Sequence, residues 1–107
     1  MANEPLITLA EHDLSEELVS HEALYEILDH GGRFRMLDGI VHHDAVQGIA
    51  VGYKEIKSTD WWACDHIPGR PLFPGVLMIE AGAQLCSWEF STRGIGIEDK
   101  FFYWKYY

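Results

Sequence analysis

The sequence predicts a single α+β domain in which antiparallel strands pack on one long, buried helix. Three observations support this fold class. Residues 34–57 carry the β-branched and alternating side chains of strands, residues 74–90 are apolar enough for a buried helix, and 107 residues leave room for only one domain. Residues 1–107 are therefore expected to share one hydrophobic core.

Two short helices are predicted within residues 13–30. Asp13 and Glu16 are three residues apart, which matches the capping-box pattern and favours a first helix. A second helix would be capped by Ser20, packed through Leu24, Ile27 and Leu28, and ended by Gly31 and Gly32. Both helices are expected to serve packing rather than chemistry.

A hairpin is predicted over residues 34–57, with strands at 34–42 and 46–57 and a turn near Asp44 and Ala45. The hairpin leads into a loop at residues 63–73. Trp61 and Trp62 stand just before this loop. Adjacent residues of a strand point to opposite faces, so one indole is expected in the core and the other in a tunnel or an interface.

The central helix is predicted over residues 74–90. Pro74 suits the first helical position, where its missing N–H is no loss, and the residues from Gly75 onward can continue as helix. Apolar side chains at positions 76, 77, 79, 81, 83 and 85 predict a helix that is buried nearly all round. Glu80 interrupts this apolar run, and a carboxylate without a partner is costly to bury.

The residues around Glu80 indicate proton-transfer chemistry, because burial disfavours the charged form of a carboxyl group and so prepares an acid. Gln84 follows at i+4 on the same helix face and is suited to orient the acid by a hydrogen bond. His66 lies in the loop at 63–73, whose prolines and glycines hold an imidazole rigidly. Gly75 offers a backbone N–H at the positive end of the helix dipole, where a carbonyl oxygen would be polarised.

Structural roles are the alternatives for both titratable residues. A histidine in a loop is commonly a surface or hydrogen-bonded structural residue, and this alternative stays open for His66 taken alone. A glutamate in an amphipathic helix commonly faces solvent, but the apolar neighbours of Glu80 leave little polar stripe for it to join. The pair of His66 and Glu80 is therefore the candidate catalytic site.

The segment at 65–85 resembles the 3-hydroxyacyl-[acyl-carrier-protein] dehydratases of the FabA/FabZ type. That family has a His-aromatic-Pro-Gly loop, then a Met-Pro-Gly-Val-Leu helix start and an acid before Ala-x-Ala-Gln. The matching residues here are His66-Ile67-Pro68-Gly69, Phe73-Pro74-Gly75-Val76-Leu77 and Glu80-Ala81-Gly82-Ala83-Gln84. Residues 30–38 resemble the family's His-Arg-Tyr-Pro-Phe-Leu-Leu-Val-Asp segment, and the similarity covers roughly residues 20–103.

This resemblance implies a hot-dog fold, which is an antiparallel sheet wrapped around a central helix. It also implies a homodimer or higher homo-oligomer with active sites at the subunit interface. His66 of one protomer would be the base that removes the C2 proton of a 3-hydroxyacyl thioester, and Glu80 of the other would assist loss of the C3 hydroxyl as water. Gly75 would bind the thioester carbonyl through its N–H, and Gln84 would support substrate binding.

Two features depart from the family pattern. Asp65 stands where the family usually has glycine before the histidine, which places a further side chain beside the base. The family continues past the central helix with several more strands, whereas this chain ends at Tyr107, so a hot-dog fold shortened at the C-terminus is expected. A strand is predicted at residues 100–107, and its aromatic side chains would favour pairing with a second chain.

Composition narrows the partners and the location. The 8 basic and 17 acidic residues give a formal net charge of −9, which argues against nucleic acid and anionic membranes as partners. Acyl carrier protein is acidic too, so its docking would need a local basic patch, for which the candidates are Arg33, Arg35, Arg70 and Arg93. Cys64 and Cys86 have no metal-binding or redox spacing, and without a secretion signal or a membrane span a cytoplasmic protein without metal is expected.

The favoured function is that of a lyase that dehydrates a (3R)-hydroxyacyl-[acyl-carrier-protein] thioester to the trans-2-enoyl thioester, in fatty-acid or polyketide synthesis. This reaction needs no cofactor beyond the 4'-phosphopantetheine arm of the carrier. An acyl thioesterase is one alternative, although the His-x-Pro-Gly loop favours dehydration. The other is a catalytically inactive, shortened hot-dog that binds acyl chains or a full-length partner.

Overall fold

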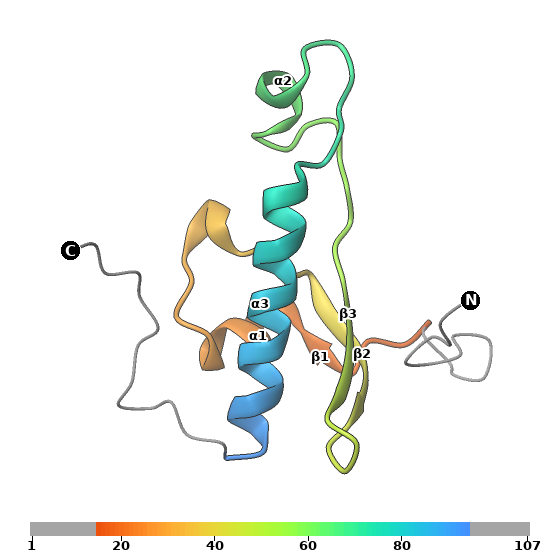
Figure 1. Ribbon diagram of the computed structural model, residues 1–107, viewed down its shortest axis with the longest axis vertical. Coiled ribbons are helices and arrows are strands. Elements are labelled where there is room, and N and C mark those ends of the chain that lie inside the picture. The colour runs from red at the N-terminus through yellow and green to blue at the C-terminus, as the bar shows by residue number, and fades with distance from the viewer. Residues whose placement is uncertain (1–14, 95–107) are drawn as a thin grey trace, which may run out of the picture.

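The computed structural model describes residues 15–94 and shows three antiparallel strands packed against one long helix (Figure 1). The elements in chain order are β1 (Val19–Ser20), α1 (His21–Ile27), the 3-10 turn η2 (Gly32–Phe34), β2 (Gly39–Asp44), β3 (Ile49–Tyr53), α2 (Ala63–His66) and α3 (Gly75–Thr92). The strands lie in the order β1-β2-β3. The fold class is α+β, as the sequence predicts, and the strand predicted at 100–107 lies outside the described residues.

The hairpin of β2 and β3 is shorter than the sequence predicts. It pairs Gly39 with Tyr53 at one end and Asp44 with Ile49 at the other, and the register shifts once along β2. The chain reverses at Asp44 as expected, because the Asp44 carboxylate accepts hydrogen bonds from the N–H groups of Val46 at 3.0 Å and Gln47 at 3.1 Å. Residues 35–38, predicted as strand, run as irregular chain from the 3-10 turn into β2.

The first predicted helix is wrong for the residues that the structure describes. Residues 15–18 are not helical, and β1 pairs antiparallel with the start of β2. Glu17 accepts a hydrogen bond from the Tyr53 hydroxyl at 2.5 Å, so this part of the chain is held by the sheet. Gly39 permits the close approach of β1 to β2, since a Cβ at position 39 would lie 2.9 Å from the Val19 carbonyl oxygen. Tertiary pairing has overridden a local capping pattern.

The second predicted helix is α1, and Ser20 caps it as expected by accepting a hydrogen bond from the N–H of Ala23 at 3.2 Å. Two details differ from the prediction. The helix ends at Ile27 rather than at residue 30, because Leu28 turns to an extended conformation while its side chain stays buried. The buried face carries Leu24, Tyr25 and Leu28, whereas Ile27 is exposed.

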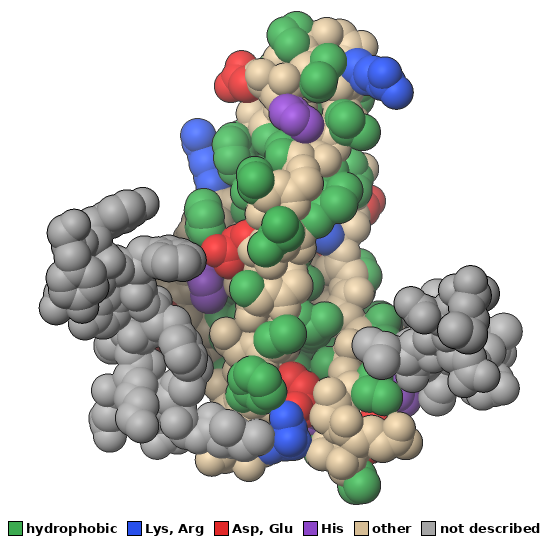
Figure 2. Space-filling model, in the orientation of Figure 1, with side chains coloured by type: hydrophobic (Ala, Val, Ile, Leu, Met, Phe, Trp, Pro, Cys, Tyr) green, Lys and Arg blue, Asp and Glu red, His purple; other side chains and the backbone are tan. Residues whose placement is uncertain are grey.

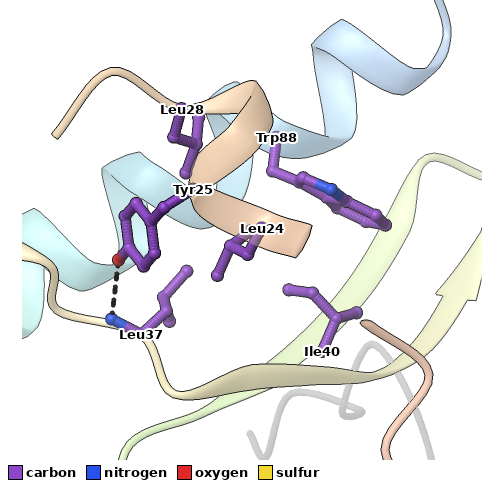
Figure 3. Packing of buried hydrophobic residues seen from close by; sticks show 6 residues of the cluster. All are labelled: Leu24, Tyr25, Leu28, Leu37, Ile40 and Trp88. Atoms are coloured by element: carbon purple, nitrogen blue, oxygen red, sulfur yellow. Dashed lines mark hydrogen bonds between the residues drawn. The ribbon is translucent and has the colours of Figure 1, made fainter. Parts of the chain in front are cut away.

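Two buried clusters hold α3 in place. The first joins α1, β2 and α3 and consists of Leu24, Tyr25, Leu28, Leu37, Ile40 and Trp88 (Figure 3). The second lies near the start of α3 and consists of Met36, Trp62, Ala63 and Leu77. Ala81 packs against both clusters, so the middle of α3 is fixed between them.

The two adjacent indoles separate as predicted, but in a turn and not on a strand. Trp62 is buried and meets the ring of Phe73 edge-on at 5.1 Å, whereas Trp61 is exposed. The buried indole anchors the segment that carries α2. No helix within residues 15–94 has both the length and the apolar character needed to cross a membrane.

Candidate active site

The start of α3 presents free backbone donors. Pro74 is extended, with φ −62° and ψ 135°, and is the N-cap residue rather than the first helical residue. Its carbonyl oxygen accepts hydrogen bonds from the N–H groups of Leu77 at 3.0 Å and Met78 at 3.2 Å. No side chain caps this end, and the N–H of Gly75 has no acceptor among residues 15–94. An unpaired N–H at the positive end of a helix dipole attracts an oxygen that carries negative charge.

Glu80 lies in the second turn of α3, six residues after Pro74, and its side chain is half-buried. Its Oε2 accepts a hydrogen bond from Gln84 Nε2 at 3.4 Å. The predicted i+4 contact between acid and amide is therefore present. Glu80 has no ion-pair partner among residues 15–94, so Gln84 is the side chain that orients it.

Gln84 is buried, with 1% of its surface exposed, and all four of its hydrogen-bonding positions are used. Its Oε1 accepts hydrogen bonds from the Tyr25 hydroxyl at 2.5 Å and from the N–H of Met36 at 3.2 Å. Its Nε2 donates to the carbonyl oxygen of Phe34 at 2.8 Å as well as to Glu80. If the amide were flipped, its NH2 group would face two donors and its oxygen would face two acceptors. The NH2 group must therefore face Glu80.

His66 is the last residue of α2, and its side chain is exposed. Its Nδ1 lies 2.7 Å from the carbonyl oxygen of Leu72, in the loop that leads to α3. A carbonyl oxygen only accepts, so Nδ1 carries the proton and donates this hydrogen bond. In the neutral imidazole, Nε2 then keeps its lone pair and is available as a base.

His66 and Glu80 form no hydrogen bond or ion pair with each other within one chain in the part that the structure describes. In Figure 1, α2 lies beyond the N-terminal end of α3, whereas Glu80 belongs to the second turn of that helix. The structure thus brings Glu80 and Gln84 together and leaves His66 apart from them.

The prediction that α3 is buried nearly all round is wrong for a single chain. Val76 is 73% exposed and Ile79 is 74% exposed, and Met78 and Phe90 are exposed as well. Figure 2 shows hydrophobic side chains along the side of α3 that faces the viewer. The three strands cover one side of the helix and leave this apolar face without a covering layer among the described residues.

A second polar cluster, not predicted from the sequence, lies near the C-terminal end of α3. Glu89 is 4% exposed, and its Oε2 lies 2.5 Å from His43 Nε2 on β2. Arg93 Nε donates to Oε1 of the same carboxylate. The i+4 spacing of Glu89 and Arg93 was a visible signal, but nothing in the sequence placed His43 beside them.

The four candidate arginines divide into two pairs. Arg35 is half-buried over the ring of Tyr25, and Arg93 is bound to Glu89. Arg33 and Arg70 are exposed and are the two candidates with free guanidinium groups in residues 15–94. No set of three or more His, Cys, Asp or Glu side chains within that range is arranged to hold a metal ion.

Comparison with known proteins identifies the relatives of this chain. Residues 28–103 match the FabA-like domain family, and all four candidate site residues lie within that range. The chain is 38% identical over 63 residues to the 3-hydroxyacyl-[acyl-carrier-protein] dehydratase FabZ of Moorella thermoacetica, a match that covers 59% of this chain and 43% of that protein.

Two further relatives carry the same name. The protein from Bartonella quintana is 41% identical over 70 residues, which cover 65% of this chain and 44% of the relative. The protein from Campylobacter jejuni strain RM1221 is 39% identical over 61 residues, which cover 57% of this chain and 41% of the relative. The chain thus spans less than half the length of these curated relatives. No solved structure matches it significantly.

Proposed function

The chain belongs to the FabA-like domain family, and from this membership we propose that it dehydrates a (3R)-hydroxyacyl thioester on acyl carrier protein to the trans-2-enoyl thioester. The reaction would serve fatty-acid or polyketide synthesis, and the fold would be a hot-dog. The observation that carries the proposal is the hydrogen bond from His66 Nδ1 to the Leu72 carbonyl, which leaves Nε2 as a base.

The proposed elimination moves two protons and breaks one C–O bond. His66 Nε2 takes the proton from C2, and the negative charge that develops on the thioester oxygen lies against the free N–H of Gly75. Glu80 acts as the general acid and gives a proton to the C3 hydroxyl, which leaves as water. Gln84 holds Glu80 in place. The electron pair of the C2–H bond forms the C2–C3 double bond as water leaves, without net oxidation or reduction, so the reaction calls for no redox cofactor.

The site is proposed to form between two copies of the chain. His66 and Glu80 do not meet within one chain, and the apolar face of α3 around Val76 and Ile79 has the exposure expected of an interface. A homodimer, or a higher homo-oligomer built from it, would place His66 of one protomer over the Glu80 of the other.

The proposed partner is acyl carrier protein with its acyl chain on 4'-phosphopantetheine. Docking of that acidic protein has to overcome the net charge of −9, and the exposed Arg33 and Arg70 are suited to this role. Cys64 and Cys86 are free, exposed thiols, which supports a reducing compartment such as the cytoplasm.

The test removes the base and the acid separately. We expect His66→Ala and Glu80→Gln each to lower the rate of enoyl thioester formation by ~100-fold or more, while the melting temperature stays near that of the wild type. Glu26→Gln is the matched control, because Glu26 is exposed on α1 and bonds to nothing in the site. Turnover within twofold of the wild type in either site variant would refute the assigned roles.

The same assay separates dehydration from hydrolysis. A thioesterase would release the free thiol of the carrier, which a thiol-reactive dye detects, whereas dehydration leaves the thioester intact. We expect enoyl thioester and no thiol above the rate of spontaneous hydrolysis. Release of thiol in step with substrate loss would identify a thioesterase instead.

A further inference from the structure

We propose that Tyr25 is a positioning residue of the active site, whose hydroxyl fixes the Gln84 amide in the orientation that holds Glu80. This inference rests on the proposed function and deepens it. Tyr25 belongs to α1, outside the loop and helix that carry the four candidate site residues, and 59 residues separate it from Gln84.

The first step of the argument is the direction of the hydrogen bonds at the phenol. The backbone N–H of Leu37 donates to the Tyr25 oxygen at 3.0 Å (Figure 3). A backbone N–H cannot accept, so the phenolic proton is free to point elsewhere. It points to Gln84 Oε1, which lies 2.5 Å from the Tyr25 oxygen.

The second step is the effect on the amide. Two donors, Tyr25 and the N–H of Met36, converge on Gln84 Oε1. With Oε1 held by these donors, Nε2 is placed to donate to the Phe34 carbonyl oxygen and to Glu80. Donors at a carbonyl oxygen polarise the amide and strengthen donation by its N–H groups, so the hydrogen bonds from Leu37 to Glu80 form one cooperative chain.

The third step is the rigidity of Tyr25 itself. Tyr25 is 7% exposed, and three neighbours surround its ring. The centroid of the ring lies 5.0 Å from that of His21, 6.4 Å from that of His30 and 5.1 Å from Cζ of the Arg35 guanidinium. Arg35 is held in turn, since its Nε donates to the His30 carbonyl oxygen at 2.9 Å. The hydroxyl therefore has little freedom to leave Gln84.

The protonation state of Tyr25 agrees with this role. Burial raises the pKa of the phenol, and this outweighs the opposite effects of the backbone N–H groups of Leu37 and Met36 and of the Arg35 charge. The phenol accordingly keeps its proton at neutral pH and remains a donor to Gln84.

The experiment compares two tyrosines in the full chain. Tyr25→Phe removes the hydroxyl that reaches Gln84, and Tyr53→Phe removes a hydroxyl that donates to Glu17 at the edge of the sheet. With (3R)-hydroxybutyryl thioester on acyl carrier protein as substrate, we expect Tyr25→Phe to lower kcat about 10- to 100-fold and to leave KM within twofold. Tyr53→Phe should leave both constants unchanged.

A double-mutant cycle separates positioning from general support of the fold. In a Gln84→Ala background, Tyr25→Phe should lower kcat no further, because the hydroxyl then has no amide to orient. A kcat within twofold of wild type for Tyr25→Phe alone, or an equal further loss in the Gln84→Ala background, would overturn the inference.

Two measurements keep the inference testable when activity cannot decide. The side-chain amide signal of Gln84, assigned by its loss in Gln84→Ala, should shift in the NMR spectrum of Tyr25→Phe and not in that of Tyr53→Phe. If Tyr25→Phe does not fold, 3-fluorotyrosine at position 25 preserves the packing and strengthens the donor, and should shift the same signal. An unmoved signal would overturn the inference, whereas an inactive wild-type protein would overturn the proposed function.

Discussion

Glu89 illustrates at the scale of one residue how a buried charge is stabilised in this protein. The hydrogen bond from His43 holds the pKa of Glu89 below its usual range, against the opposing effect of burial, and Arg93 contributes through a second hydrogen bond and its charge. The carboxylate thereby fastens the C-terminal part of α3 to β2. Neither α3 nor the hairpin shows this contact in its own sequence.

The lowered pKa of Glu89 predicts how the stability of the fold depends on pH. A carboxyl group whose pKa is lower in the folded state stabilises the fold above its unfolded pKa of about 4.3, and this contribution is lost as pH falls through the folded pKa. We expect Glu89→Gln to lower the melting temperature at pH 7 and to lose less stability than the wild type below about pH 4.

Thermal melts between pH 7 and pH 3 check the Glu89 prediction. Glu26→Gln serves as control, because Glu26 is exposed and has no such partners in the part of the chain that the structure describes, and its curve should follow that of the wild type. Parallel curves for Glu89→Gln and wild type across the whole range would contradict the assigned role of the carboxylate.

Gln84 and Tyr25 show which contacts of the candidate site can be predicted from neighbouring residues and which cannot. Gln84 was predicted to orient Glu80 because an i+4 spacing on a helix is a local geometric fact. The packing face predicted for α1 carries Leu24, Ile27 and Leu28, and no local pattern indicates Tyr25. The structure buries Tyr25 and leaves Ile27 exposed, and the Tyr25 hydroxyl is hydrogen-bonded to Leu37 and Gln84.

Among the elements, α3 has an uncapped, exposed N-terminal end and is packed in the core farther along its length. The free N–H of Gly75 stands at its start, the Glu80–Gln84 contact follows in the second and third turns, and Trp88 and Glu89 are buried near its end. A helix that is fixed along its body holds its first residues still without covering them. This arrangement suits a donor that must remain accessible to a substrate.

Gly75→Ala tests whether that open end is used. A Cβ at this position would meet nothing within 4 Å among residues 15–94, and alanine favours helix over glycine by up to about 1 kcal/mol, so stability should be unchanged or slightly higher. We expect turnover to fall at least ~10-fold, because the added methyl group would stand where the thioester is proposed to lie.

The Gly75 prediction is checked by kcat/KM together with a thermal melt. Gly82→Ala is the matched control, since Gly82 lies on the same helix, and a Cβ there also meets nothing within 4 Å in the described part of the chain. Equal activity in Gly75→Ala and wild type would place the thioester elsewhere.

For the whole molecule, the proposed second copy of the chain would account both for the separation of His66 from Glu80 and for the exposed apolar face of α3. A site that takes its base from one protomer and its acid from the other can be restored by mixing two inactive variants. We expect refolded mixtures of His66→Ala and Glu80→Gln to regain about a quarter of wild-type activity, because half of the dimers are mixed and each of these has one intact site.

Complementation is measured as activity after joint refolding at equal amounts, with sedimentation to determine the oligomer size. Each variant refolded alone should stay inactive. An inactive mixture of properly formed dimers, or a wild-type protein that sediments as a monomer, would contradict a shared site.

Local sequence patterns predict the α+β class, the reversal at Asp44, the Ser20 cap and the contact of Glu80 with Gln84, because each is encoded in residues a few positions apart or in the alternation of apolar and polar side chains. The packed fold, by contrast, pairs the chain before α1 as β1 and brings Tyr25 to Gln84. It also brings His43 to Glu89, 46 residues away. Such contacts depend on how separate elements pack, and local propensity carries no record of a distant partner.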